Sequence, residues 1–265
     1  MADRLDIILV NRGFAKSREK AKSLIKEGKV YINNIMQTKP AAITEDDADI
    51  HIVGGPDKYV SRGGYKLEKA IEEFSLNLKG FTCMDIGAST GGFTDCMLKN
   101  GADYVYAIDV GHDQLHESLR EDDRVKSMEG INFRYLKRED IERAVDFASV
   151  DVSFISLKLI LPVAVNFLTD NGEMVCLVKP QFEAGREHVN KKGVVKDEKI
   201  HVKILREIID MAEESGFSVK NLTYSPIRGP EGNIEYLMHI SKVSMERGIS
   251  VNAANTVSEA FASLK

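Results

Sequence analysis

A glycine-rich turn between an expected strand and an expected helix constrains the fold of this chain most. Residues 84–93 read MDIGASTGGF, so an apolar strand ends with an acidic residue and a run rich in glycine leads into a helix. Glycine lets the backbone come close to a bound nucleoside, and ligands of open α/β sheets bind at the carboxyl ends of the strands. We expect a nucleoside site formed by Asp85, Gly87, Ser89, Thr90, Gly91, Gly92 and Phe93.

A second acidic residue strengthens this expectation. Asp109 ends the next expected strand, 24 residues after Asp85. A carboxylate in that position is suited to accept hydrogen bonds from both hydroxyls of a ribose. The glycine spacing is G-x-x-x-G-G and not the G-x-G-x-x-G of dinucleotide sites, so it does not favour pyrophosphate binding.

Strands and helices alternate after Tyr59, which predicts an α/β fold with a largely parallel, Rossmann-like sheet covered on both faces. The last two expected strands lie close together with a short turn, so we expect the last one to run antiparallel. The expected strands are 82–86, 104–109, 145–153, 173–178, 219–225 and 234–241. The expected helices are 64–74, 93–100, 114–119, 157–168, 196–215 and 255–264.

The start of the chain has a different pattern, which is typical of a small α+β domain. Ser17 is a suitable N-cap for a short amphipathic helix over Ser17–Lys26, and Gly28 follows as a stop signal. Alternating residues from Val30 to Ile32 predict a strand that enters a hairpin turn at Asn33-Asn34.

A break in the pattern separates this domain from the rest of the chain. A second short strand is expected at Asp49–Val53, and Gly54-Gly55-Pro56 then interrupts regular structure. We place the boundary at Lys58. The sequence thus predicts a small domain over residues 1–58 and a larger α/β domain over residues 59–265.

Charge is distributed unevenly along the chain. The whole chain has a net charge of −5, but residues 1–40 hold nine lysine and arginine residues against four acidic ones, a local net charge of +5. A basic region on an acidic protein indicates a polyanionic partner such as a nucleic acid.

Composition and patterning argue against several other classes of protein. No stretch approaches about 18 uninterrupted apolar residues, and the first residues offer no small-residue cleavage site, so we expect a cytoplasmic protein without a membrane segment. The three cysteines form no C-x-x-C pair. His112 and His116 have no third ligand close by in the sequence, so we expect no metal site.

Several motifs along the chain resemble those of a known family. The stretch Asp85–Phe93 looks like the S-adenosylmethionine loop of the FtsJ-type ribose methyltransferases, and within that group the chain is most similar to the TlyA family. The likeness covers nearly the whole chain, because Arg4-Leu-Asp6, SREKA at 17–21 and GKVYIN at 28–33 resemble an RNA-binding module shared with a small-subunit ribosomal protein and some pseudouridine synthases. It continues through YVSRGGYKL at 59–67, DVSFIS at 151–156, VKPQFE at 178–183 and GPEGNIEY at 229–236.

The resemblance implies S-adenosyl-L-methionine as the cofactor and a catalytic tetrad of Lys66, Asp151, Lys179 and Glu235. Lys179 would lie nearest the ribose 2′-hydroxyl, either as a base or as a cation that favours the alkoxide, while the two carboxylates orient it and Lys66 helps to hold the substrate. Asn132, after a short third strand, is a candidate for contact with the adenine. Independently of the family, a lysine just before Pro180 at the end of an apolar strand is an unusual place for a solvated charge.

The resemblance also implies a target, a cytidine of ribosomal RNA, in the large subunit and for some relatives in the small one. The partner would be ribosomal RNA or a ribosomal subunit. Basic side chains are expected to contact phosphates and position the RNA, with little reading of bases. The candidates are Arg4, Arg12, Arg18, Lys20, Lys22 and Arg62.

Three other functions compete with this interpretation. Proteins similar to TlyA are often called hemolysins, but a cytolysin needs a spanning helix, a barrel hairpin or a membrane-binding helix, and none stands out. A ribosome-binding factor without catalysis is disfavoured because all four tetrad residues are present. A base methyltransferase is disfavoured because the strand end reads Asp151-Val-Ser-Phe154, without an Asn/Asp-Pro-Pro-aromatic sequence.

Overall fold

The structure is a computed structural model of the 265-residue chain. It describes residues 2–15, 17–32, 35–45, 48, 50–52, 58–242 and 251–264. The chain separates into two compact units, residues 1–58 and residues 59–265. The turn expected at Asn33-Asn34 and the break expected at Gly54-Gly55-Pro56 lie outside the described residues.

The unit of residues 1–58 is a small α+β fold. Its two helices pack against each other, and its short strands form two antiparallel sheets of order β1-β4 and β3-β2-β5. The helices are α1 (Leu5–Asn11) and α2 (Arg18–Lys26). The strands are β1 (Ala2–Arg4), β2 (Val30–Ile32), β3 (Ile35–Gln37), β4 (Ile43–Glu45) and β5 (Ile50–Ile52).

The helix α2 begins where the sequence predicted. The Ser17 side chain accepts a hydrogen bond from the Lys20 amide at 3.3 Å, which satisfies one of the free amides of the first turn. Ala21, Leu24 and Ile25 are buried on one face of the helix. The opposite side is therefore free to carry the basic residues.

A buried carboxylate organises two arginines of this unit. The side chain of Asp6 is fully buried, and it accepts hydrogen bonds from Arg4 at 2.9 Å and 3.2 Å and from Arg18 at 2.9 Å. The hydrogen bond from Arg4 is the largest cause that lowers the pKa of Asp6 to about 2. Both guanidinium groups remain about half exposed, so each still presents donors to solvent.

Replacing Asp6 with asparagine is expected to destabilise this unit by about 3 kcal/mol, because two guanidinium groups lose their buried counter-charge. The pKa of Asp6 in the folded state lies below its ordinary value. The stabilisation is therefore fully present above about pH 4 and is lost as the pH falls towards 2. Amide hydrogen exchange of α1 and α2 in the full chain at pH 7 measures the effect, with the exposed Asp3→Asn as control. Equal protection in both variants would contradict the assignment.

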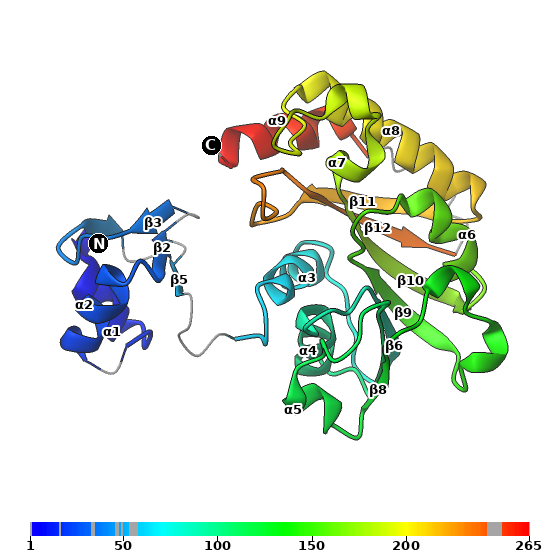
Figure 1. Ribbon diagram of the computed structural model, residues 1–265, viewed down its shortest axis with the longest axis horizontal. Helices are drawn as coiled ribbons and strands as arrows, with labels where there is room; N and C mark the ends of the chain where they lie inside the picture. Colours follow the sequence, from blue (N-terminus) through cyan, green and yellow to red (C-terminus); the bar gives the residue numbers. More distant parts are fainter. Residues whose placement is uncertain are drawn as a thin grey trace. The chain divides into compact units, whose positions relative to one another are not determined.

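The unit of residues 59–265 contains a seven-stranded mixed sheet of order β11-β12-β10-β9-β6-β7-β8 (Figure 1). Neighbouring strands from β10 to β8 are parallel, whereas β12 runs antiparallel to both β10 and β11, as predicted. The strands are β6 (Thr82–Ile86), β7 (Tyr104–Ile108), β8 (Val125–Met128), β9 (Val145–Val150), β10 (Leu168–Val178), β11 (Ser218–Tyr224) and β12 (Tyr236–Ser241).

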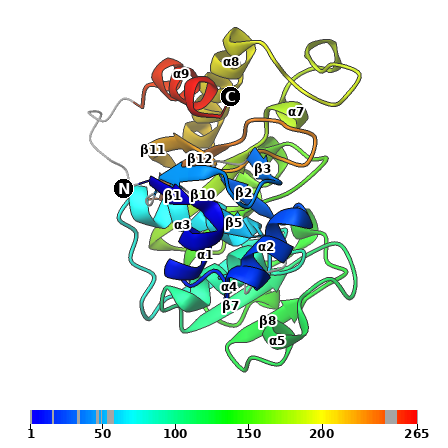
Figure 2. The ribbon, with the colours of Figure 1, turned by 90° about the vertical axis from the view of Figure 1, so that its left-hand side faces the viewer.

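Helices cover both faces of this sheet. Side chains from α3 and α4 belong to one buried apolar cluster, and side chains from α6, α8 and α9 belong to another. The helices α8 and α9 lie side by side in both views (Figures 1 and 2). The helices are α3 (Gly63–Glu73), α4 (Gly92–Lys99), α5 (Glu117–Arg120), α6 (Leu161–Ala164), α7 (Pro180–Glu183), α8 (Glu198–Glu214) and α9 (Ala253–Ser263).

The apolar run at 157–168 is not one helix, contrary to expectation. It forms a 3₁₀ turn, η3 (Leu157–Leu159), then α6, and enters β10 at Leu168. Pro162 lacks an amide hydrogen and lies in the first turn of α6, and the Asn166 side chain donates to the Pro162 carbonyl at 3.1 Å, just past the end of that helix. No helix in the described ranges has both the length and the apolar character needed to cross a membrane.

Candidate active site

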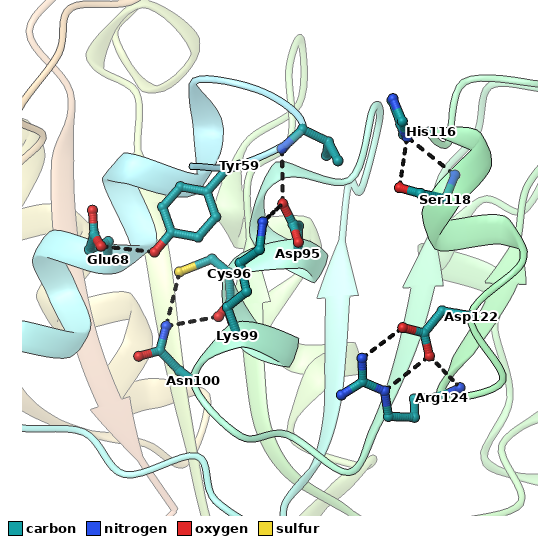
Figure 3. A network of polar contacts seen from close by, with 11 residues as sticks. Tyr59, Glu68, Asp95, Cys96, Lys99, Asn100, His116, Ser118, Asp122 and Arg124 are labelled. Atoms are coloured by element: carbon teal, nitrogen blue, oxygen red, sulfur yellow. Dashed lines mark hydrogen bonds and ion pairs between the residues drawn. The ribbon is translucent and has the colours of Figure 1, made fainter. Parts of the chain in front are cut away.

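The segment that enters the larger unit is fixed at its first two residues (Figure 3). The Tyr59 hydroxyl donates to Glu68 at 2.9 Å, and the Val60 amide donates to Asp95 at 2.9 Å. Asp95 also accepts from Lys99 at 2.8 Å. This anchoring positions the following residues, 61–64, beside the glycine-rich turn.

The turn between β6 and α4 adopts backbone conformations that favour glycine. Gly87 and Gly91 have φ angles of 88° and 95°, and Ser89 has a φ of 46°. A Cβ atom on Gly87 would lie 2.5 Å from the Asp151 carbonyl oxygen, and one on Gly92 would lie 2.3 Å from the Ser61 hydroxyl. The turn is therefore a cradle whose close approaches leave no room for side chains at these glycines.

Asp85 lies beneath this turn and is fully buried. Its carboxylate accepts hydrogen bonds from the Thr94 amide at 2.8 Å, the Thr94 hydroxyl at 2.7 Å and the Ser149 hydroxyl at 3.1 Å. It does not line the pocket described below. The structure thus places Asp85 where it holds the turn onto α4 and β9.

Burial is the largest cause that raises the pKa of Asp85 to about 7. The folded state therefore favours the protonated carboxyl, and the stability that this group contributes is lost as the pH rises from about 4 to about 7. We expect Asp85→Asn to be more stable than the wild type at pH 8 by a margin that shrinks towards pH 5. Thermal unfolding across this range measures the margin, and a margin independent of pH would contradict the titration.

Asp109 and Asn132 lie next to each other in the fold, after β7 and β8. The Asp109 carboxylate accepts from the Ser89 amide at 2.8 Å and from the Gly111 amide at 2.7 Å, and the Asp109 carbonyl accepts from the Ile131 amide at 2.9 Å. Asn132 caps the 3₁₀ turn η1 (Phe133–Tyr135) by accepting from the Arg134 amide at 3.2 Å. Asp109 is thus tied directly to the glycine-rich turn.

The four tetrad residues come together in one chain of alternating charges. Lys179 Nζ lies 2.5 Å from an Asp151 oxygen, and the other Asp151 oxygen lies 3.9 Å from Lys66 Nζ. Lys66 Nζ in turn lies 2.6 Å from Glu235. Asp151 is 21% exposed, whereas Glu235 is only 1% exposed. Along the order Lys179–Asp151–Lys66–Glu235, Asp151 is therefore the most open member, the two lysines are 9% and 10% exposed, and Glu235 is the most buried.

A pocket of about 460 Å³ contains both the tetrad and the glycine-rich turn. Of the residues expected at the turn, Gly87, Ser89, Thr90, Gly92 and Phe93 line it, and Arg62 does as well. The pocket is also lined by residues that were not predicted from the sequence, namely Ser61, Gly63, Ala88, Ser153, Ile227, Arg228 and Pro230. Lys179 Nζ donates a hydrogen bond to the Ser153 hydroxyl at 3.1 Å. The position of Ser153 two residues after Asp151 was the one signal available for it.

An aromatic pair stands beside the tetrad. The rings of Phe154 and Phe182 lie 5.0 Å apart, and Lys179 Nζ lies 5.9 Å from the centre of the Phe182 ring. Phe154 is 91% exposed and has a φ of 63°, an uncommon combination for a large apolar residue. Strained residues of this kind concentrate at functional sites.

The remaining predicted RNA-binding residues lie in the unit of residues 1–58. Asp6 brings Arg4 and Arg18 together, whereas Lys22 pairs with Glu19 at 2.8 Å. Arg12 donates to the Ala48 carbonyl at the end of α1, and Lys20 is exposed on α2. The described part of the chain contains no group of three metal-ligating side chains. His116 instead hydrogen-bonds Ser118 at the start of α5 (Figure 3).

The mixed sheet, the glycine cradle at the end of β6 and the polar pocket beside it are typical of an α/β enzyme of Rossmann-like type. The chain belongs to the FtsJ-like methyltransferase family, because the sequence model of that family matches residues 59–242. The model of the S4 domain matches residues 3–46.

Relatives match nearly the whole chain. A candidate rRNA methyltransferase of Bacillus subtilis, YqxC, is 50% identical over 90% of this chain and 85% of that protein. The 16S/23S rRNA (cytidine-2′-O)-methyltransferase TlyA of Mycobacterium tuberculosis is 41% identical over 93% of this chain and 92% of that protein. The solved structure of a candidate hemolysin from Streptococcus thermophilus superposes on this chain with a TM-score of 0.77. The two sequences are 45% identical, and the match covers 99% of this chain and 96% of that one.

Proposed function

We propose that this protein transfers a methyl group from S-adenosyl-L-methionine to the 2′-hydroxyl of a cytidine in ribosomal RNA. One observation carries the proposal: the Lys179–Asp151–Lys66–Glu235 chain opens into the same pocket as the glycine cradle. Relatives named as rRNA (cytidine-2′-O)-methyltransferases support the substrate and the atom that is modified. A ribosomal RNA substrate also implies action in the cytoplasm.

The glycine cradle suits the proposed cofactor, because its close approaches leave the backbone itself as the binding surface. The turn residues Gly87, Ser89, Thr90 and Gly92 would hold it, with Asp109 near the ribose and Asn132 near the adenine. Asp85 and Gly91 would act by shaping the turn. When bound, S-adenosylmethionine supplies a methyl group on a sulfonium, which needs no further activation beyond an aligned nucleophile.

The charges of the tetrad support a role for Lys179 as a cation. Its Nζ lies 2.5 Å from Asp151 and 3.1 Å from the Ser153 hydroxyl, an arrangement that suits an ammonium group. In this proposal the 2′-hydroxyl gives its proton to solvent as its oxygen bonds to the methyl carbon, and Lys179 stabilises the negative charge that develops on that oxygen. Asp151 orients Lys179, and the buried Lys66–Glu235 pair fixes Asp151 from behind.

We propose that residues 1–58 form the RNA-binding domain and residues 59–265 the catalytic domain. Arg4 and Arg18, oriented by Asp6, supply paired guanidinium groups that suit phosphates, and Arg12, Lys20 and Lys22 add further positive charge.

Arg62, exposed at the catalytic pocket, would contact RNA close to the target. The exposed Phe154 ring, backed by Phe182, provides a face on which an unstacked base can lie.

Incubation with tritium-labelled S-adenosylmethionine and unmethylated ribosomal subunits or their RNA tests the proposal. We expect label in a 2′-O-methylcytidine, which nuclease digestion and chromatography identify. Label on a base would overturn the site of transfer. Failure to bind the cofactor would overturn the enzyme assignment altogether and leave the alternatives of a cytolysin or a non-catalytic ribosome-binding factor.

A further inference from the structure

A second pocket, of about 400 Å³, adjoins the catalytic pocket. It lies between the segment 190–196, the loop that joins β11 to β12, and α9, and Figure 1 shows that loop in orange beside α9. Arg228 lines both this pocket and the catalytic one. The two pockets are therefore neighbours that share one guanidinium group. We call this second one the flanking pocket.

The walls of the flanking pocket are fixed by hydrogen bonds. Asn233, which is 1% exposed, accepts from the Val195 amide at 3.2 Å and donates to the Gly193 carbonyl at 2.8 Å. The buried His201 lies 3.0 Å from the Val195 carbonyl through Nε2 and 2.7 Å from the Tyr236 hydroxyl through Nδ1. The segment before α8 is thus fastened to Asn233 and to Tyr236, residues on either side of Glu235 at the start of β12.

The charge of the flanking pocket is positive. Lys192, Lys196 and Arg228 line it, against one acidic residue, Glu231. Within the described ranges no ion pair neutralises either lysine, and Arg228 donates only to the carbonyls of Gly232 and Leu264. Lys192 and Lys196 can therefore pair with an anion, and the Arg228 guanidinium has N–H donors beyond those that meet the two carbonyls, which makes this a suitable site for a phosphate.

An apolar wall completes the flanking pocket, formed by Val194, Ile234 and Phe261. A sugar or the face of a base can pack on such a wall while its phosphate meets the basic side chains. A mixed lining of this kind therefore fits a nucleotide better than it fits a free inorganic anion.

We propose that the flanking pocket binds the phosphate and sugar of a nucleotide next to the methylated one in the substrate RNA. This inference rests on the proposed function, because an RNA strand that brings a 2′-hydroxyl to Lys179 must continue past the edge of the catalytic pocket. Arg228, at that edge, bridges the target nucleotide and its neighbour. The flanking pocket thus sets the position of the strand within the larger unit itself.

A double variant, Lys192→Ala with Lys196→Ala, tests this inference. We expect KM for ribosomal RNA to rise about tenfold or more, and the slope of log affinity against log salt concentration to become shallower by about 1, because the contacts to one phosphate are lost. Both lysines are exposed and lie outside the tetrad and the glycine cradle, so kcat and the Kd of the cofactor are expected to stay within about twofold of wild type.

The matched control is Lys79→Ala with Lys126→Ala, which removes the same charge from two exposed positions. Lys126 lies on β8, at the opposite edge of the sheet from β11. If the two double variants change KM and the salt slope equally, the flanking pocket makes no special contact and the inference is wrong, while methylation by the wild type keeps the proposed function intact. A wild type that methylates no RNA would overturn both.

RNA with single modified phosphates can identify which phosphate the flanking pocket binds. Once the methylated nucleotide is mapped, single neutral methylphosphonate linkages are placed at each phosphate on either side of it. We expect one linkage to weaken binding by the wild type and to have little additional effect on the Lys192→Ala/Lys196→Ala variant. Additive effects at every linkage would overturn the assignment of a phosphate to this pocket.

Discussion

Replacing Lys179 with alanine is expected to lower kcat for methyl transfer by about a thousandfold, the scale of a lost acid–base or charge-stabilising group. The Kd of the cofactor is expected to change by less than about threefold, because in the proposed function the backbone of the glycine cradle, and not Lys179, holds it. Single-turnover transfer of labelled methyl groups and equilibrium cofactor binding measure the two effects.

The fold should survive this change. Asp151 is 21% exposed and keeps Lys66 at 3.9 Å when Lys179 is absent, so its charge is not left buried alone. The exposed Lys158→Ala, on η3, serves as control for loss of a lysine near the pocket. Activity of Lys179→Ala equal to that of Lys158→Ala would show that the tetrad does not carry the reaction.

Replacing Gly87 with alanine is expected to weaken cofactor binding by at least about a hundredfold. The φ of 88° is strained for any residue with a Cβ, at about 1–3 kcal/mol, and the added carbon would lie 2.5 Å from the Asp151 backbone oxygen. The turn and Asp151 must therefore move apart, which disturbs the cradle and the tetrad together. Isothermal titration with S-adenosylmethionine measures the loss of affinity.

The variant Gly80→Ala serves as a control that has the backbone strain of a positive φ but not the steric clash. Gly80 has a φ of 80°, but an added Cβ would meet nothing within 4 Å. Both variants should lose thermal stability from backbone strain, Gly87→Ala more so because its Cβ also meets the Asp151 carbonyl oxygen, and only Gly87→Ala should lose the cofactor. Normal cofactor affinity in Gly87→Ala would mean that the cradle is not the binding surface.

The sequence predicted the parts of the fold whose signals are local. The helix α8 repeats apolar residues at helical spacing, α2 has a serine cap, and β11 and β12 are consecutive strands, so each was foreseen with small errors at the ends, although residues 225–235 form a longer loop than the short turn expected between the two strands. The run at 157–168 was wrongly assigned to one helix, because its apolar residues do not mark where a helix is interrupted. Pro162, which lacks an amide hydrogen, lies in the first turn of a new short helix instead.

The tetrad was foreseen through family resemblance and strand order, but its connections were not. Lys66 and Glu235 are 169 residues apart, and only the tertiary fold shows that they pair directly. The charge count of the first 40 residues treated Asp6 as one more acid, whereas the structure makes it the buried partner of two arginines. Arg228 and Ser61 lie in loops, where no periodicity marks their direction.

Under the proposed function, the pairing of Lys66 with Glu235 also sets the stage of synthesis at which the chain can become active. The unit of residues 1–58 has its own core and emerges from the ribosome first, so it can fold while the rest of the chain is still being made. The tetrad stays incomplete until the strand β12 has been translated and inserted between β10 and β11. A nascent chain can therefore acquire its basic surface long before it acquires the means to modify RNA.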